Sequence, residues 1–374
     1  MALSGIWAWN LETPLTLAIL FGIAAILGVC SWLARRHRPA LVSLGVASCV
    51  FFVFGIVASI NLNTNWWFQF GNVFGMTSAD TSGDIDQAKK HADDQNIPTT
   101  GRRVSATIPA TESGVTAREA VIWLPPAWYE TPRPKLPVIM MYHGTPGGPG
   151  QVLDNGAQAA LEKLQSENHG VAPIAINPDI NGTGPGDSEC VDGPAGKWET
   201  YLATDVVDYA KTELGVSTNP QQWATMGFSE GGYCSLMLAF KHQDTFKAAV
   251  SASGYDAPSD ISLSAEAKAA YTVSNLITNG TDNAAMAIFG GIGTTGTEPP
   301  GYNKVIETAC ADQVEVVSMT YQGLGDVSGV WAPTFTAAVP WLAFRFGITT
   351  EPAQLPSDAK LCNMPAPKPG QGPS

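Results

Sequence analysis

Apolar residues follow two patterns along this chain. Residues 14–34 and 40–60 form two runs of 21 residues that contain no charged side chain. As a helix, each run is long enough to cross the roughly 30 Å of hydrocarbon in a bilayer. The link between them, Arg35-Arg36-His37-Arg38, has room for no more than a turn. This pattern predicts a hairpin of two transmembrane helices.

The charges around the two runs predict their orientation. The arginines lie in the link, whereas Glu12 is the only charge before the first run, and Asp80 and Asp84 are the first charges after the second. Since positively charged short loops stay in the cytoplasm, we expect both flanks outside. Tryptophans that could anchor the outer interface are Trp7, Trp9, Trp66 and Trp67. A cleaved signal peptide is the alternative, but the second full-length run and the lack of basic residues at the N-terminus argue against it.

The second pattern begins near residue 103, where short apolar runs alternate with segments of helical spacing. Strands are expected at 120–124, 136–142, 171–176, 223–226, 247–251, 285–289 and 314–319, and helices at 198–214, 233–241 and 331–346. This alternation predicts an α/β fold with a mostly parallel sheet. We therefore expect four parts: a membrane hairpin (1–62), an interfacial segment followed by a linker or a short surface helix (63–102), an α/β domain (103–350) and a Pro-rich tail (351–374) that is disordered apart from any tether at Cys362.

Composition narrows the class of protein. The chain is 45% hydrophobic and only 14% charged, which fits a membrane component. Its net charge of −13 argues against nucleic acid as a partner. There is no C-x-x-C, no H-E-x-x-H and no phosphate-binding G-x-x-x-x-G-K-[ST], so neither a metal nor a cofactor is expected. Nothing in the sequence specifies an oligomeric state.

The six cysteines fall into two groups. Cys30 and Cys49 lie inside the apolar runs, where we expect them to be inert. The other four lie in the predicted extracellular domain, where disulfides persist, and four cysteines allow three pairings. We favour Cys190 with Cys234 and Cys310 with Cys362, and free buried thiols are the alternative.

The strongest chemical motif is Gly227-Phe228-Ser229-Glu230-Gly231, which sits between an expected strand and an expected helix. In this context a G-x-S-x-G displays its serine on a strained turn as a nucleophile. A second motif, His143-Gly144-Thr145, follows another strand. We expect the backbone amides of Thr145 and Glu230 to form an oxyanion hole. The Glu230 side chain is expected to cap its helix, with substrate contact as the alternative.

A third loop, from Asn177-Pro178-Asp179 to Cys190, also follows a strand. It could shape the pocket or be a surface loop, and the sequence favours neither reading.

The run from Asp187 to Gly254, including MGFSEGGYCSLMLAFKHQDTFKAAVSASG, resembles the putative-esterase family of α/β-hydrolases, which includes esterase D-like enzymes and actinobacterial mycolyltransferases. The resemblance covers roughly residues 105–348. It implies an α/β-hydrolase fold, a Ser–Asp/Glu–His triad and acyl-ester substrates in or near the cell envelope. By this resemblance Ser229 is the nucleophile and Glu298 the nearest candidate for the acid. Asp326 occupies the position expected of the histidine base.

The missing histidine leaves two hypotheses. His242 is the only histidine after Ser229, and it lies at the far end of the elbow helix. The first hypothesis is a membrane-anchored, outward-facing serine esterase or acyltransferase acting on lipid or glycolipid acyl esters, in which Asp326 replaces the base or His143 or His242 reaches the serine. The second is an inactive hydrolase-like binding or assembly protein of the envelope. A carboxylate of ordinary pKa is a weak base toward a serine hydroxyl, so this position decides between them.

Overall fold

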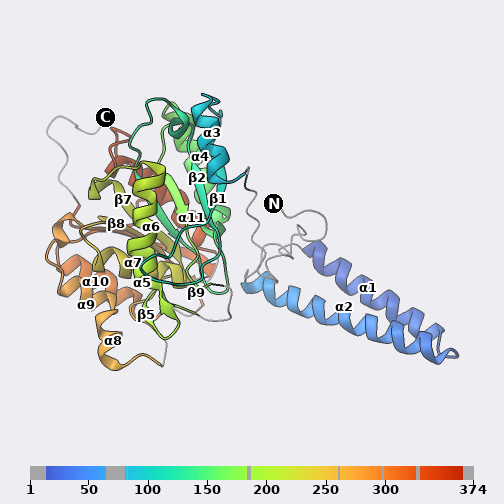
Figure 1. Ribbon diagram of the computed structural model, residues 1–374. Helices are drawn as coiled ribbons and strands as arrows, with labels where there is room; N and C mark the ends of the chain where they lie inside the picture. Colours follow the sequence, from blue (N-terminus) through green and yellow to red (C-terminus); the bar gives the residue numbers. More distant parts are fainter. Residues whose placement is uncertain are drawn as a thin grey trace. The chain divides into compact units, whose positions relative to one another are not determined.

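The computed structural model describes residues 14–64, 81, 83–182, 187–259, 262–296, 299–325 and 329–364. These residues belong to two compact units, one within Ala2–Ser78 and one within Ala79–Ser374 (Figure 1). The four tryptophans expected at the membrane interface lie outside the described residues.

The first unit contains the two expected apolar helices, α1 (Pro14–Leu33) and α2 (Arg38–Thr64). Two serine hydroxyls hold them together: Ser48 Oγ donates to Ala24 O at 2.7 Å and Ser31 Oγ donates to Leu41 O at 2.8 Å. Such hydrogen bonds and close packing join helices in lipid. The hairpin exposes most of its apolar surface, since only 22% of the first candidate span and 6% of the second are buried. By length and composition, both helices could cross a membrane.

The second unit is built on a nine-stranded sheet in the order β1-β2-β4-β3-β7-β8-β9-β10-β11. The six strands from β4 to β10 are parallel to one another, and β1, β2 and β11 are antiparallel to their neighbours. The mostly parallel α/β sheet expected from the sequence is therefore confirmed. The strands are β1 (Arg102–Ala106), β2 (Ala120–Leu124), β3 (Val138–Tyr142), β4 (Ile174–Asn177), β7 (Trp223–Phe228), β8 (Ala248–Ala252), β9 (Ala287–Thr295), β10 (Glu315–Gly325) and β11 (Lys360–Cys362).

Alternate residues of each strand pack into two apolar cores, one on each face of the sheet. In β2, for example, Ile122 packs into one core, and Val121 and Trp123 pack into the other. The first core is covered by α3 (Ile85–Asp93), α7 (Glu230–Lys241), α9 (Val273–Thr278), α10 (Tyr302–Ala311) and a continuous helical segment that begins with α5 (Trp198–Thr200), includes α6 (Val206–Tyr209) and ends at Leu214. The second core is covered by α4 (Gln158–Glu167) and α11 (Trp331–Arg345) (Figure 1).

Two segments beyond the expected α/β domain belong to the sheet unit. The segment expected as a linker or a short surface helix forms α3, whose Ile85, Ala88 and Ala92 are buried in the first core and not at the surface. The tail, expected to be disordered apart from a tether at Cys362, forms β11 at that cysteine, and β11 pairs with β10 at the sheet edge. The disulfide Cys310–Cys362 ties β11 to α10, and the second disulfide joins Cys190 to Cys234, which confirms both expected pairings.

Candidate active site

Ser229 occupies a strained turn between β7 and α7. Its backbone has φ 53° and ψ −121°, a conformation that L-residues rarely adopt. Two glycines permit this turn: a Cβ on Gly227 would overlap the main chain of Gly231, and a Cβ on Gly231 would overlap the carbonyl of Tyr142. The Ser229 side chain is half-buried, so a small reagent can reach it. This is the geometry of a nucleophile elbow.

The turn that carries Thr145 lies beside the elbow. In the sheet register Tyr142 of β3 pairs with Gly227 of β7, so both chains leave the sheet at the same edge. Among the described residues, neither the Thr145 N–H nor the Glu230 N–H donates a hydrogen bond to the protein. The assignment of these two amides to an oxyanion hole stays a prediction.

His143 holds this turn in place. It is 1% exposed, its Nδ1 donates to Gly144 O at 2.8 Å, and its Nε2 lies 3.3 Å from Ile180 N and 3.4 Å from Asp179 Oδ1. Because protein partners occupy both ring nitrogens, His143 is a structural residue and not a base for Ser229.

The loop after β4 supports the same turn. Asp179 is fully buried and accepts hydrogen bonds from Arg118 N and Nη2, each at 2.7 Å. Burial opposes its charge, but hydrogen bonds with His143 and Arg118 and the positive charge of Arg118 keep the pKa of Asp179 well below its usual range. The start of this loop is thus buried and not a surface loop, and whether the loop shapes a pocket stays a prediction.

His242 is far from the candidate nucleophile. It ends the 12-residue helix α7 that begins beside Ser229, a rise of about 18 Å. Its Nε2 lies 2.9 Å from Glu199 Oε1. All five histidines of the chain are in the described residues, and none hydrogen-bonds to Ser229.

The expected acid and the residue at the base position, Glu298 and Asp326, lie outside the described residues. In the sequence, Glu298 comes three residues after the end of β9, and Asp326 directly follows β10. Strands β7, β9 and β10 are parallel, so their carboxyl ends meet at the edge where Ser229 lies. The roles of Glu298 and Asp326 stay predictions.

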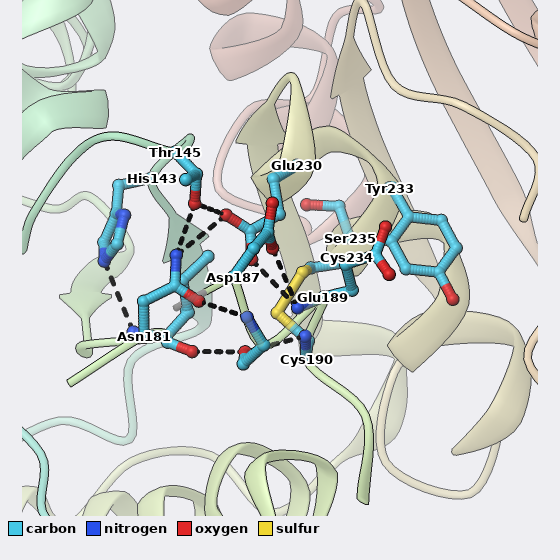
Figure 2. Close-up of a disulfide and its surroundings, with 12 residues drawn as sticks. His143, Thr145, Asn181, Asp187, Glu189, Cys190, Glu230, Tyr233, Cys234 and Ser235 are labelled. Atoms are coloured by element: carbon cyan, nitrogen blue, oxygen red, sulfur yellow. Dashed lines mark hydrogen bonds between the residues drawn. A yellow bond between two sulfur atoms is a disulfide. The ribbon is translucent and has the colours of Figure 1, made fainter. Parts of the chain in front are cut away.

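The side chain of Glu230 does not cap its helix, contrary to the sequence expectation. It is 2% exposed and accepts hydrogen bonds from the Thr145 hydroxyl, from Asn181 Nδ2 at 2.9 Å and from Glu189 N at 3.1 Å (Figure 2). Burial raises the pKa of the Glu230 carboxyl well above its usual range, and the adjacent Asp187 raises it further. The sequence offered no signal for this contact, because its partners lie 41 to 85 residues away along the chain.

A disulfide completes this cluster. Cys190, beside Glu189, is bonded to Cys234 on the elbow helix (Figure 2). The two sulfurs and a Glu230 oxygen lie within 4.8 Å of one another. Since metal binding needs thiolates, sulfurs joined in a disulfide are not ligands. The bond instead fixes the loop that contacts Glu230.

The family model described as "Putative esterase" matches residues 114–346, which is well over half of the chain. The chain belongs to this esterase family. The matched residues include the elbow, the Thr145 turn and most of the sheet.

This chain aligns with only part of the length of each of its sequence relatives. An uncharacterized protein of Corynebacterium glutamicum is 32% identical over 156 residues, which cover 41% of this chain and 37% of that protein. The MPT51/MPB51 antigen of Mycobacterium bovis is 33% identical over 100 residues, which cover 27% of this chain and 28% of the antigen. The chain thus aligns with about a third of the length of these relatives.

Solved structures show the fold. A ferulic acid esterase superposes with a TM-score of 0.55 at 18% identity, covering 66% of this chain and 98% of that one. An S-formylglutathione hydrolase from Agrobacterium tumefaciens superposes with a TM-score of 0.55 at 15% identity, covering 67% of this chain and 97% of that one. The sheet unit therefore has the α/β-hydrolase fold that the sequence resemblance implied.

Proposed function

We propose that this protein is a serine esterase or acyltransferase in which Ser229 is the nucleophile and the amides of Thr145 and Glu230 stabilise the oxyanion. The observation that carries the proposal is the strained, accessible Ser229 beside two amides without protein partners. A strained backbone persists only where the surrounding structure imposes it, and such strain concentrates at functional sites. Two amides of this kind are typically worth several kcal/mol of barrier in acyl transfer.

The substrate we propose is an acyl ester of the cell envelope, presented at the outer surface of the plasma membrane. The two apolar helices support a membrane anchor, and the arginines between them support an outward-facing hydrolase unit. Anchoring an esterase beside lipid would raise the local concentration of acyl chains at Ser229.

One observation favours a second candidate, an inactive binding or assembly protein. No histidine of this chain reaches Ser229 in the described residues, and a serine hydroxyl needs a base to become a nucleophile. Loss of one triad member commonly costs several orders of magnitude in rate, although oxyanion and binding contributions remain.

A fluorophosphonate probe tests the proposal directly. The full-length protein in isolated membranes should be labelled covalently, and Ser229→Ala should abolish labelling because only this serine occupies the elbow. Ser166→Ala, which removes an exposed serine from α4 of the same unit, is the matched control and should be labelled like the wild type. A wild type that resists the probe, or a Ser229→Ala variant that still reacts, would favour the inactive protein.

A further inference from the structure

A second carboxyl group lies against the buried carboxyl of Glu230. Asp187 is exposed and lies next to Glu230 (Figure 2). One donor, the Glu189 N–H, lies 3.1 Å from Glu230 Oε1 and 3.1 Å from Asp187 Oδ1. Two carboxylates that share one donor lie close enough to repel each other when both are ionised, so one proton between them is the favoured state.

The donors around Glu230 have fixed directions. Asn181 Oδ1 accepts a hydrogen bond from Ser188 N at 2.7 Å, which orients the Asn181 amide so that its Nδ2 faces Thr145 and Glu230. The Thr145 hydroxyl accepts from Asn181 and donates to Glu230 Oε2. The Glu230 carboxyl therefore joins the oxyanion turn to the loop that carries Asp187.

No cation offsets the charge of this pair among the described residues, because neither carboxyl forms an ion pair with a lysine, arginine or histidine. The other titratable groups nearby are acids. Glu189 turns its carboxylate toward Ser259 N and the Tyr255 hydroxyl, at 2.7 and 3.2 Å. Tyr255 stacks on Tyr233 with ring centroids 4.7 Å apart. A second full negative charge at Glu230 would thus face Asp187 and Glu189 with hydrogen-bond donors around it but with no paired cation among the described residues.

We propose that Glu230 and Asp187 share one proton, and that this singly charged pair holds the Thr145 turn in the geometry that binds the oxyanion. Glu230 is a positioning residue in this scheme, acting through the Thr145 hydroxyl. Loss of the shared proton places a second negative charge beside amides that must stabilise a negative oxygen, which opposes catalysis. The positioning role of Glu230 rests on the proposed function, whereas the shared proton does not.

The direction of the pH effect on stability follows from the raised pKa of Glu230. A free glutamate ionises near pH 4.3, and burial with Asp187 raises the pKa of Glu230 in the folded chain. The folded state then binds more protons than the unfolded state between these two pKa values. The pair's contribution to stability is fully present below about pH 4 and is lost as the pH rises through the folded pKa of Glu230.

Glu230→Gln tests the shared proton, because its neutral amide imitates the protonated carboxyl group. The amide oxygen can accept from Thr145 and Asn181, and the amide N–H can donate to Asp187. We would measure the melting temperature of the full-length chain in detergent from about pH 5 to about pH 9, a range that brackets shifted carboxyl groups. The wild type should lose stability relative to Glu230→Gln as the pH rises. Parallel curves for the two proteins would overturn the shared proton.

Asp187→Asn is the second variant, chosen because Asp187 is exposed and its replacement should fold. Without the neighbouring charge, Glu230 should ionise at lower pH, so the loss of stability should move toward acid. An unchanged curve would overturn the pairing of Glu230 with Asp187.

Fluorophosphonate labelling rates test the positioning role. At the alkaline end Glu230→Gln should react about tenfold faster than the wild type, since losing one oxyanion donor costs roughly 10²–10³ in rate. The ratio of the two rates should fall toward the acid end, where the wild-type pair keeps its proton. A constant rate ratio would overturn the positioning role. A wild type that is never labelled would overturn the positioning role together with the proposed function, and the melting curves would still decide the shared proton.

Discussion

At the scale of single residues, Ser229 and the groups around it have unequal support. The elbow motif predicted a displayed serine, and the backbone of Ser229 has the strain that this display requires. The two histidines considered as substitutes for the missing base are bonded elsewhere, His143 to Gly144 and His242 to Glu199. Asp326 therefore stays the best candidate for the position of the base.

Asp326→His tests that assignment. If residue 326 occupies the position of the base, a histidine there should raise the rate of ester hydrolysis and of fluorophosphonate labelling by about 10²–10⁴, the usual contribution of a general base. The reason is that a histidine of pKa near 6.5 is half-neutral at that pH and accepts the serine proton, which a carboxylate of pKa near 4 does poorly. Asp326→Asn is the matched control, because it removes the charge without supplying a base. Equal rates for the two variants would contradict the assignment.

At the scale of elements, the two disulfides stabilise different parts of the fold. Cys310–Cys362 ties the edge strand β11 to α10, with a sequence separation of 52 residues. Cys190–Cys234 ties the loop next to Glu189 to the elbow helix α7, with a separation of 44 residues. The first bond closes the sheet edge, and the second supports the contacts of Glu230.

Replacing each cysteine pair with serines should therefore give different outcomes. Both double variants should lose about 2–4 kcal/mol of unfolding free energy, as expected for bonds that close loops of this length. Only the Cys190/Cys234 variant should also react more slowly with the fluorophosphonate, since it alone releases the loop whose Glu189 N–H binds Glu230. Melting curves and labelling rates under native conditions measure both effects. Equal loss of labelling in the two variants would show that the second bond has no special role at the site.

At the scale of the whole molecule, the chain consists of an apolar hairpin and an α/β-hydrolase unit, each with its own packing. The hairpin leaves its apolar side chains exposed, as a membrane span does, whereas the hydrolase unit buries two cores. Of the three arginines of the hairpin, Arg35 and Arg36 lie in its turn and Arg38 begins α2, and the proposed topology follows from these positions.

Lysine labelling tests this topology, because Lys89 is the first lysine in the chain and every lysine lies in the hydrolase unit. A membrane-impermeant amine reagent should label the protein in intact cells if this unit is outside. A variant with Arg35, Arg36 and Arg38 changed to Glu should be labelled less, since the charges that hold the turn inside are gone. Labelling that occurs only after the membrane is made permeable would place the hydrolase unit in the cytoplasm.

The two long helices, the parallel strands, the elbow and the cysteine pairs could all be predicted from the order of residues. Each leaves a local sign: an apolar run of membrane length, a short buried run between turns, a glycine-flanked serine. The edge strands were harder, because β1 is partly exposed and β11 is three residues long, held by its bond to Cys310. Such short segments have weak preferences of their own and depend on the strand they pair with.

The contacts of Glu230 could not be predicted in this way. An acid in the first turn of a helix is ordinarily stabilised by the helix dipole, and local reasoning stops there. Burial against Asn181 and Glu189, and the bond to Thr145 from 85 residues away, arise only when β3, β4 and β7 end at one edge of the sheet. Local periodicity thus specifies which elements form and where a serine is displayed. The protonation state and environment of the groups beside that serine depend on which distant loops the folded sheet brings together, because burial and neighbouring charge control both.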